Sequence, residues 1–443
     1  MVNTNVKIIE ELQSFLNLVL EDSEIKELFT TNSKDFIRDR KLPLRKIIGM
    51  LINLPKRSLS IELQSFFESL EQSDLCCTKG AFSLQRTKLK PIFFKVWNDF
   101  LIKSFYNFYD NDVKRWEGFK LMAVDGSNFS VVNKPEVLRH FGSADNQFGG
   151  VPMARAMQIH DVLNDLTIWG DIFPRRCSEN AIIANHIRHL PEDSLTLFDR
   201  GYPSYSLIYL LANEENPRYF LMRCKTTFSN EVKNFVAGNQ TDAVTTIYPS
   251  LESIERLKEH GYLVTQKTGI KIRMVKVMLP DGEVEVLLTD LYDYKIFTLK
   301  KISDLYFMRW KIEISYGKQK NQLQMEIFSG HRVVYIEQDY AAGLFVANLQ
   351  SIIEKQCDLE VKEISANRCY EYKINRNVSW ASLKNRILKL FIQSNNSLTI
   401  LIELQNLFIR NIEPVRPLRH SSRSLPKRKR GKYQTFTNYR RAI

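Results

Sequence analysis

The spacing of apolar residues divides the chain into helical and β-type stretches. From residue 1 to about 110, apolar side chains recur at intervals of three and four, which predicts helices. After residue 118 the pattern changes to short apolar runs that end at turn residues, such as Phe119 to Val124 before Asp125-Gly126. From Ala341 the helical spacing returns. We therefore expect a β-containing centre between two helical regions.

The centre is expected to contain five strands and two helices in the order β-β-β-α-β-α-β. Asn164-Asp165 resembles a tight hairpin turn between the second and third strands, and Ser178 is a predicted N-cap of the first helix. This order is typical of a ribonuclease-H-like α/β core, a sheet with helices packed on it. The five expected strands are Phe119 to Val124, Met153 to Val162, Leu166 to Phe173, Ser194 to Phe198 and Arg218 to Cys224.

The helical start of the chain has two interpretations. A long helix is expected after Gly80, with Arg86, Lys88, Lys90 and Lys95 outside its apolar face. A helix, a Gly-containing turn and a basic helix are compatible with a DNA-binding helix-turn-helix. An ordinary helical bundle would show the same pattern, and the sequence leaves both open.

A second change of pattern separates the fifth strand from the last helices and indicates a β-rich insertion. The turn signal Pro280-Asp281-Gly282 lies within it. Its β-type runs are Ala243 to Tyr248, Tyr262 to Gln266, Ile270 to Met278 and Val284 to Leu288. The expected regions are a helical N-terminal DNA-binding region (1–110), the first part of the core (118–224), the insertion (225–298), the end of the catalytic core (299–357), a helical C-terminal region (358–413) and a basic tail (414–443).

Charge indicates the kind of partner. The formal net charge is +13, and the tail from Pro414 contains ten Lys or Arg residues and no acid. This favours a polyanion, nucleic acid before membrane. No run approaches about 20 apolar residues, so no membrane span is expected. The six scattered cysteines have no zinc spacing and suggest free thiols in a reducing compartment, which places the chain in the cytoplasm.

Leu305 to Lys320 is predicted to form one helix with a polar edge. At about 100° per residue, Tyr306, Arg309, Glu313 and Lys320 fall within about 60° of one another. The neighbouring stripe of Leu305, Met308, Ile312 and Tyr316 is expected to be buried. Taken alone, the polar edge could equally be a solvated charged face.

Two aspartates change that balance. Asp125 and Asp199 each end an apolar strand and are followed by a glycine within two residues. If their strands pair in parallel, both carboxylates emerge at the same edge of the sheet, where Glu313 could join them. A single aspartate at a strand end is more often a turn or cap residue. Three carboxylates together favour two Mg²⁺ or Mn²⁺ ions, about 4 Å apart, which is the usual arrangement for phosphodiester chemistry.

At these residues the chain resembles the DDE transposases of bacterial insertion sequences of the IS-four type. Their Y-x2-R-x3-E-x6-K signature is matched at full spacing by Tyr306, Arg309, Glu313 and Lys320. Val-Asp-Gly-Ser around Asp125 is similar to the family's first catalytic motif, and Phe-Asp-Arg-Gly-Tyr around Asp199 to its second. The β-rich insertion before the third motif also matches the family.

The resemblance implies cut-and-paste DNA transposition catalysed by Asp125, Asp199 and Glu313 with two divalent ions. Water first cuts at the element end, and the freed 3′-hydroxyl then forms a hairpin, which is reopened before strand transfer into target DNA. The resemblance also implies a homodimer that bridges both element ends at the nucleoid.

The expected DNA contacts come from the same motifs. Arg309 and Lys320 are expected to contact phosphates and Tyr306 to hold the strand end, with Arg200 of the second motif as a further contact. Trp310 is expected to hold a base flipped from the hairpin, and a packing role in the core is its alternative.

Two other functions remain open from sequence. A ribonuclease-H-like nuclease or resolvase would share the fold and metals without strand transfer. A domesticated DNA-binding protein would be marked by a lost carboxylate, and all three are present.

We predict that the tail from Pro414 contributes mainly sequence-independent DNA affinity. Each phosphate contact adds about 0.9 to the slope of log affinity against log salt, so deleting the tail should flatten that slope. Titration of the full-length and truncated chains with duplex DNA at several salt concentrations measures it. An unchanged slope would contradict a role for the tail in phosphate binding.

Overall fold

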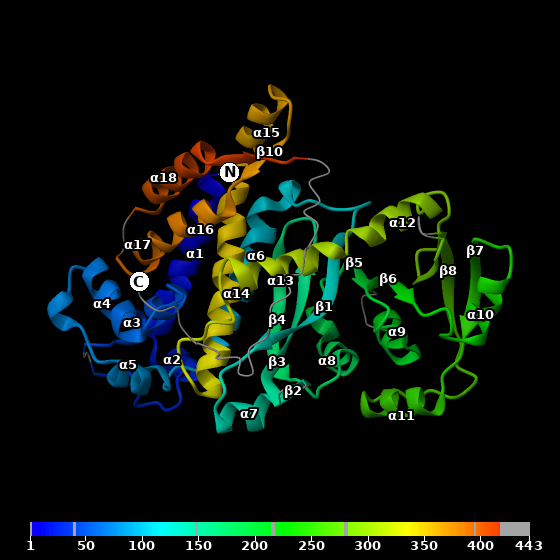
Figure 1. Ribbon diagram of the computed structural model, residues 1–443, viewed down its shortest axis with the longest axis horizontal. Coiled ribbons are helices and arrows are strands. Elements are labelled where there is room, and N and C mark those ends of the chain that lie inside the picture. The colour runs from blue at the N-terminus through cyan, green and yellow to red at the C-terminus, as the bar shows by residue number, and fades with distance from the viewer. Residues whose placement is uncertain are drawn as a thin grey trace.

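The central feature is a mixed sheet seen in a computed structural model, which describes residues 2–38, 41–146, 149–213, 218–278, 282–393 and 396–416. Within these ranges nine strands form one sheet in the order β2-β3-β1-β5-β6-β9-β8-β7, and β4 pairs with β3. In Figure 1 the helices from the two chain ends lie to the left, and the last strands of the sheet lie to the right.

The middle of this sheet has the strand order β4-β3-β1-β5-β6. β3 pairs antiparallel with β1 and β4, whereas β5 is parallel to both β1 and β6. Three antiparallel strands followed by two parallel ones in this order form a ribonuclease-H-like core, which confirms the predicted α/β fold. The strands are β1 (Lys120–Ser130), β3 (Gly149–Asp161), β4 (Leu166–Pro174), β5 (Ser194–Phe198) and β6 (Tyr219–Cys224).

The turn and the helix cap predicted in the core are confirmed. The turn between β3 and β4 contains Asn164-Asp165, and Asp165 has the positive φ of 56° expected of a tight turn. The Ser178 hydroxyl accepts a hydrogen bond from the Ala181 amide (3.1 Å) and caps α8 (Glu179–His186). Further core elements are α7 (Pro135–Phe141), β2 (Ser143–Asn146), the 3₁₀ helix Ile187–His189 and α9 (Tyr205–Ala212).

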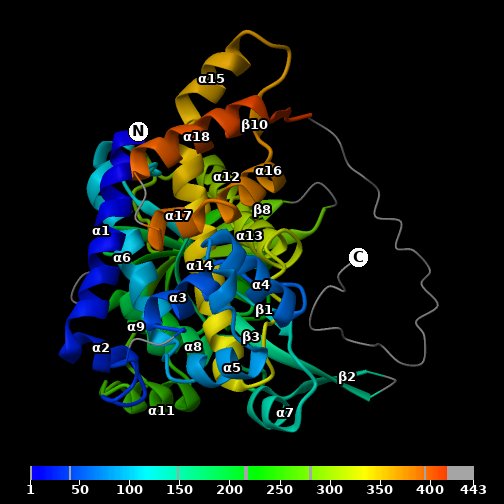
Figure 2. The same ribbon diagram turned by 90° about the vertical axis from the view of Figure 1, so that its left-hand side faces the viewer.

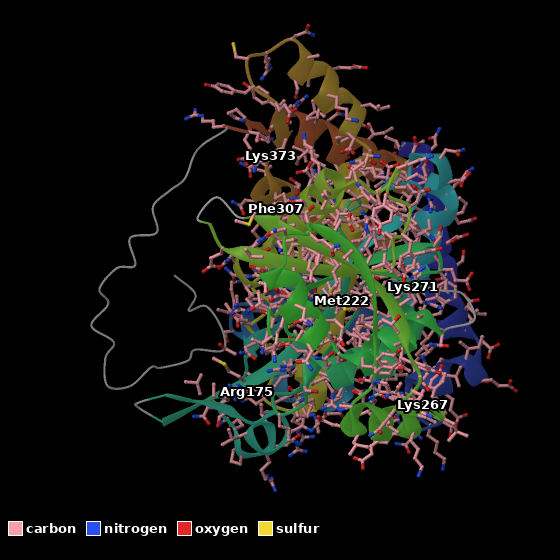
Figure 3. The ribbon with its side chains drawn as sticks, turned by 90° about the vertical axis from the view of Figure 1, so that its right-hand side faces the viewer. Arg175, Met222, Lys267, Lys271, Phe307 and Lys373 are labelled. Carbon is pink, nitrogen blue, oxygen red and sulfur yellow. The ribbon has the colours of Figure 1, made fainter. Side chains whose placement is uncertain are left out.

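The residues between β6 and the last part of the core extend the sheet. β9 pairs antiparallel with β6, then β8 with β9 and β7 with β8. Figure 3 views this side, where Lys267 and Lys271 are exposed and Met222 of β6 is buried. The elements are α10 (Asn230–Ala237), β7 (Asp242–Ile247), α11 (Leu251–Glu259), β8 (Ile270–Met278) and β9 (Val284–Thr289).

The prediction of one strand in this part of the chain is wrong. Tyr262 to Gln266 forms no strand, and the chain turns there instead. The Thr265 amide donates to the Thr268 hydroxyl (3.0 Å), so a local turn satisfies the backbone that a ladder would otherwise pair. Helices α10 and α11 were not expected. The predicted turn residues Pro280 and Asp281 lie outside the described residues.

The two ends of the chain pack together around α14 (Val333–Lys355), which runs beside the sheet (Figure 1). Trp97 stacks on Phe345 with ring centroids 4.2 Å apart, and the Asn5 amide group donates to the Ile352 carbonyl (3.2 Å). Figure 2 shows the first helices, in blue, beside the last ones, in orange and red. Both ends therefore belong to one hydrophobic core.

The first helices are α1 (Val2–Glu21), α2 (Ser23–Phe29), α3 (Leu44–Ile52), α4 (Leu59–Ser69), α5 (Lys79–Arg86) and α6 (Ile92–Tyr109), with 3₁₀ helices at Ser73–Leu75 and Asp110–Asp112. The last elements are α15 (Asp358–Ala366), β10 (Tyr372–Ile374), α16 (Arg376–Lys384), α17 (Ile387–Phe391), α18 (Ser397–Arg410) and β11 (Ile412–Pro414). The basic tail beyond Arg416 lies outside the described residues.

The long helix expected after Gly80 is two helices, α5 and α6, because the chain leaves the helix to pair Leu89 with Thr30. Arg86 is buried in an ion pair with Asp339, and the other cations of this stretch also bond within the protein. These cations therefore contribute to packing within the helical region, and its binding to DNA stays a prediction.

Among the described residues, no helix is long and apolar enough to cross a membrane.

We predict that Asp339→Ala strongly destabilises the fold. The Arg86 guanidinium donates to Asp339 (2.8 Å) and would be left as a buried charge without its partner. Such a loss costs about 3–5 kcal/mol in the free energy of unfolding. Urea unfolding followed by circular dichroism measures it.

The control is Asp358→Ala, which breaks the more exposed pair with Lys114. Pairs of that kind contribute about 0–1 kcal/mol. Equal effects of the two substitutions would contradict the importance of the buried pair.

Candidate active site

Two aspartates lie side by side at one edge of the sheet. β1 and β5 pair in parallel, with Val124 opposite Phe198, so Asp125 and Asp199 follow at the same level. This confirms the parallel pairing on which the sequence argument depended. The carboxyl end of parallel strands is where α/β folds place their sites.

Both carboxylates also share one face of the sheet. Residues two apart along a strand point to the same face. Ala123 of β1 and Leu197 of β5 belong to the hydrophobic cluster that includes Leu305 and Ile312. Asp125 and Asp199 continue those two rows, so their side chains are directed toward the helices that cover this face.

These helices are α12 (Leu299–Phe307) and α13 (Trp310–Asn321), and the single helix predicted over this stretch was wrong. At the junction the Arg309 amide bonds to the Tyr306 carbonyl (3.1 Å), a bond that spans three residues as in a 3₁₀ turn. Residues three apart eclipse one another in such a turn. The break therefore places Tyr306 and Arg309 on one side, toward the aspartates.

Two of the four signature residues, Tyr306 and Arg309, contact the second aspartate, and Arg309 links it to a third, Glu313. The Tyr306 hydroxyl donates to Asp199 Oδ1 (3.4 Å). Arg309 Nη2 donates to Glu313 Oε1 (3.0 Å) and lies 4.0 Å from Asp199 Oδ1. Arg309 is only 5% exposed, so its guanidinium is a buried cation held between two carboxylates.

Helix α13 is fixed to the first aspartate through Tyr316. Its hydroxyl donates to the backbone carbonyls of Asp125 (2.9 Å) and Ala156 (3.2 Å). Most of the stripe predicted to be buried is confirmed, since Leu305, Ile312 and Tyr316 are buried. A single hydroxyl thus joins α13 to both β1 and β3.

Electrostatics single out Asp125. Burial raises the pKa of Asp125 to about 7, with a further rise from the negative charges of Glu179 and Glu313 against the opposing effect of Arg309. A carboxyl group in this position favours its charged form only when a cation is near.

The remaining predicted residues lie around this centre. Lys320 Nζ donates to Ser127 Oγ (2.8 Å) and the Asn128 carbonyl (2.6 Å), just beyond Asp125.

Trp310 is 54% exposed, next to Arg309, so its alternative role as core filler is wrong. Arg200 is exposed on the turn after β5.

Whether this site could hold a metal ion depends on the side chains that offer ligand atoms. Among the described residues, no three His, Cys, Asp or Glu side chains lie close enough together to hold an ion as they are placed. Arg309 contacts two of the three carboxylates. Carboxylate oxygens are nevertheless hard ligands, and by their chemistry they fit Mg²⁺ or Mn²⁺. His186 and His189 lie against the Trp169 ring, with ring centroids 4.5 Å and 5.4 Å away.

Sequence reasoning missed Glu179, the first residue of α8. Its Oε2 accepts a hydrogen bond from the Tyr202 hydroxyl (2.9 Å), and its Oε1 lies 3.4 Å from the Arg155 guanidinium. In sequence it is only the first residue after an N-cap. The glycine at Gly126 is the one available signal, because it leaves room for a side chain to approach β1.

The fold and these side chains define a ribonuclease-H-like protein with carboxylates gathered at the end of its central strands. No family model matches the chain. It is 24% identical over 165 residues to the putative transposase InsZ of Escherichia coli K12, covering 37% of this chain and 54% of the relative. It is 26% identical over 216 residues to the transposase InsG for insertion sequence element IS4 of the same strain, covering 47% and 46%.

The chain thus spans about half the length of these curated relatives. Among solved structures, it is similar to a piggyBac transposase in a synaptic complex with hairpin DNA. The TM-score is 0.40 with 10% sequence identity, over 95% of this chain and 86% of the other.

Proposed function

We propose that this protein is a DNA transposase of the DDE type that cuts the ends of a mobile element and joins them to target DNA. The observation that carries the proposal is the parallel register that sets Asp125 beside Asp199 under the helix bearing Arg309 and Glu313. The names of the partial relatives and the net charge of +13 support it.

In this proposal Asp125, Asp199 and Glu313 would hold two Mg²⁺ or Mn²⁺ ions. Bound ions would activate the attacking oxygen and stabilise the leaving oxygen of a phosphodiester. The protein's own contribution is a rigid frame, because Tyr316 fixes α13 to β1 and Tyr306 donates to Asp199.

The cations and aromatic residues around the centre would position DNA. Arg309 and Lys320 supply charge for phosphates near the cut, and Arg200 lies exposed beside Asp199. Tyr306 would hold the strand end. The exposed ring of Trp310 is available to stack on an unpaired base, an interaction worth about 1–3 kcal/mol.

The finer steps follow the family resemblance. Cleavage would be followed by a hairpin at the element end, by its reopening and by strand transfer into target DNA. A homodimer would bridge the two ends. Because the substrate is chromosomal DNA, we place this activity at the bacterial nucleoid.

The alternatives are a nuclease or resolvase without strand transfer and a domesticated DNA-binding protein. A nuclease or resolvase would share the site and the basic charge, whereas a domesticated protein would share the basic charge and would be marked by a lost carboxylate. An assay that offers a precut 3′-hydroxyl end and a target plasmid separates them, since only a transposase should join the two DNAs.

We predict that Asp125, Asp199 and Glu313 act as one unit. Replacing any one with Ala should abolish Mg²⁺-dependent cleavage and strand transfer. The losses should be non-additive, since a site lacking one ligand is already disabled. DNA binding should survive or strengthen, because a negative charge facing phosphates is removed. Gel-resolved cleavage of a labelled element end, with a metal-free binding titration beside it, measures both properties.

Arg309→Ala and Lys320→Ala serve as comparisons and should weaken positioning while leaving some residual nicking. Cleavage by Glu313→Ala at the wild-type rate would show that the third ligand is misassigned.

We also predict that Trp310→Ala spares first-strand nicking and impairs hairpin formation, because only the second step needs a displaced base. Because the Trp310 side chain is exposed, we expect this substitution to leave the fold intact. Nicked and hairpin products are separated on a denaturing gel. Equal loss of both products would contradict a specific role for the ring.

A further inference from the structure

Glu179 approaches the candidate site from the face of the sheet opposite α13. Alternate residues of β1 feed the two faces, and Val124 belongs to the cluster that contains Ile182 and Ile183 of α8. Gly126 therefore opens toward α8. A Cβ built there would lie 2.6 Å from Glu179 Oε1, so the carboxylate occupies the space that a side chain would need.

This carboxylate links both aspartate motifs. Tyr202, which is buried, donates its hydroxyl to Glu179 Oε2 (2.9 Å). The Tyr202 amide bonds back to the Asp199 carbonyl (3.0 Å), which closes the turn after β5. Glu179 thus contacts the residue directly after Asp125 and also holds the turn that begins at Asp199.

The next residue strengthens the same connection. The Asn180 side chain donates to the Gly201 carbonyl (2.7 Å). The first turn of α8 is therefore bonded to the turn after Asp199 twice, through Glu179 and through Asn180. On the other side, Arg155 of β3 lies 3.4 Å from Glu179 Oε1, which balances part of its charge. Strands β1 and β3 and the turn after β5 therefore meet at this first residue of α8.

We propose that Glu179 is a positioning residue of the candidate active site. It fixes the Asp125 strand and the Asp199 turn relative to each other and adds a fourth negative charge that favours binding of divalent cations. This inference rests on the proposed function. Residues that orient metal ligands without binding the metal commonly matter about 10- to 100-fold in metal affinity when changed.

The test is Mn²⁺ binding by the full chain without DNA, followed by electron paramagnetic resonance of the free ion. Glu179→Gln keeps an acceptor for Tyr202 but removes the charge, and we expect the dissociation constant to rise about tenfold or more. Tyr202→Phe keeps the charge but removes the tie, and a smaller rise is expected. Glu179→Asp, which keeps the charge on a shorter side chain, should recover part of the affinity.

Two measurements separate positioning from a general folding role. In Glu179→Gln the midpoint of thermal unfolding without metal should stay unchanged while Mn²⁺ binding weakens. A merely structural role would instead lower the midpoint together with the Mn²⁺ affinity. Glu252→Gln is the matched control, because Glu252 lies in the first turn of α11, exposed and paired with Arg256. Its Mn²⁺ affinity should equal that of the wild type.

The outcomes distinguish this inference from the proposed function. If Asp125→Ala weakens Mn²⁺ binding and Glu179→Gln does not, the positioning role is overturned while the metal site stands. If the wild-type chain binds no Mn²⁺, or Asp125→Ala binds it as well as the wild type, the metal site and the inference fall together. A Glu179→Gln chain that loses its thermal transition also overturns the positioning role.

Discussion

Mutual repulsion among carboxylates at one edge of the sheet is the constraint on which the site depends. Two unit charges about 4 Å apart interact by roughly 4 kcal/mol at an effective dielectric constant of about 20. A free energy of that size is comparable with the net stability of many domains. The buried guanidinium of Arg309, in contact with Asp199 and Glu313, compensates part of it and so permits the acidic groups to converge.

The position of that guanidinium depends on residues from the whole chain. α13 is held against β1 by Tyr316, and α14 follows it into the core shared by the first and last helices. Trp97 on Phe345 and Asn5 on the Ile352 carbonyl show how far apart in sequence the supporting contacts lie. The N-terminal helices therefore help to set the site geometry, whatever else they bind.

The sequence predicted those parts that depend on local patterns. Asp125 and Asp199 could be paired because each ends an apolar run before a glycine, and Glu313 because helical periodicity joins it to Arg309. The 3₁₀ junction at Arg309 could not be predicted, since every residue there is a competent helix former. Glu179 could not either, because only tertiary packing brings the start of α8 behind Gly126. The burial of Arg86 could not be predicted either, because its partner Asp339 lies far along the chain.

Arg309 is also where the stability of the free protein and the proposed chemistry compete. A divalent ion attracts a carboxylate twice as strongly as a guanidinium does at equal distance in the same medium. On the proposed function, Asp199 and Glu313 would hold divalent ions, whose charge would compensate these carboxylates in place of Arg309. The guanidinium, attached to the same helix one turn before Glu313, would then be released toward a phosphate that needs a cation at that place. One buried side chain would in this way compensate the carboxylates in the free protein and contribute to phosphate binding in the proposed complex.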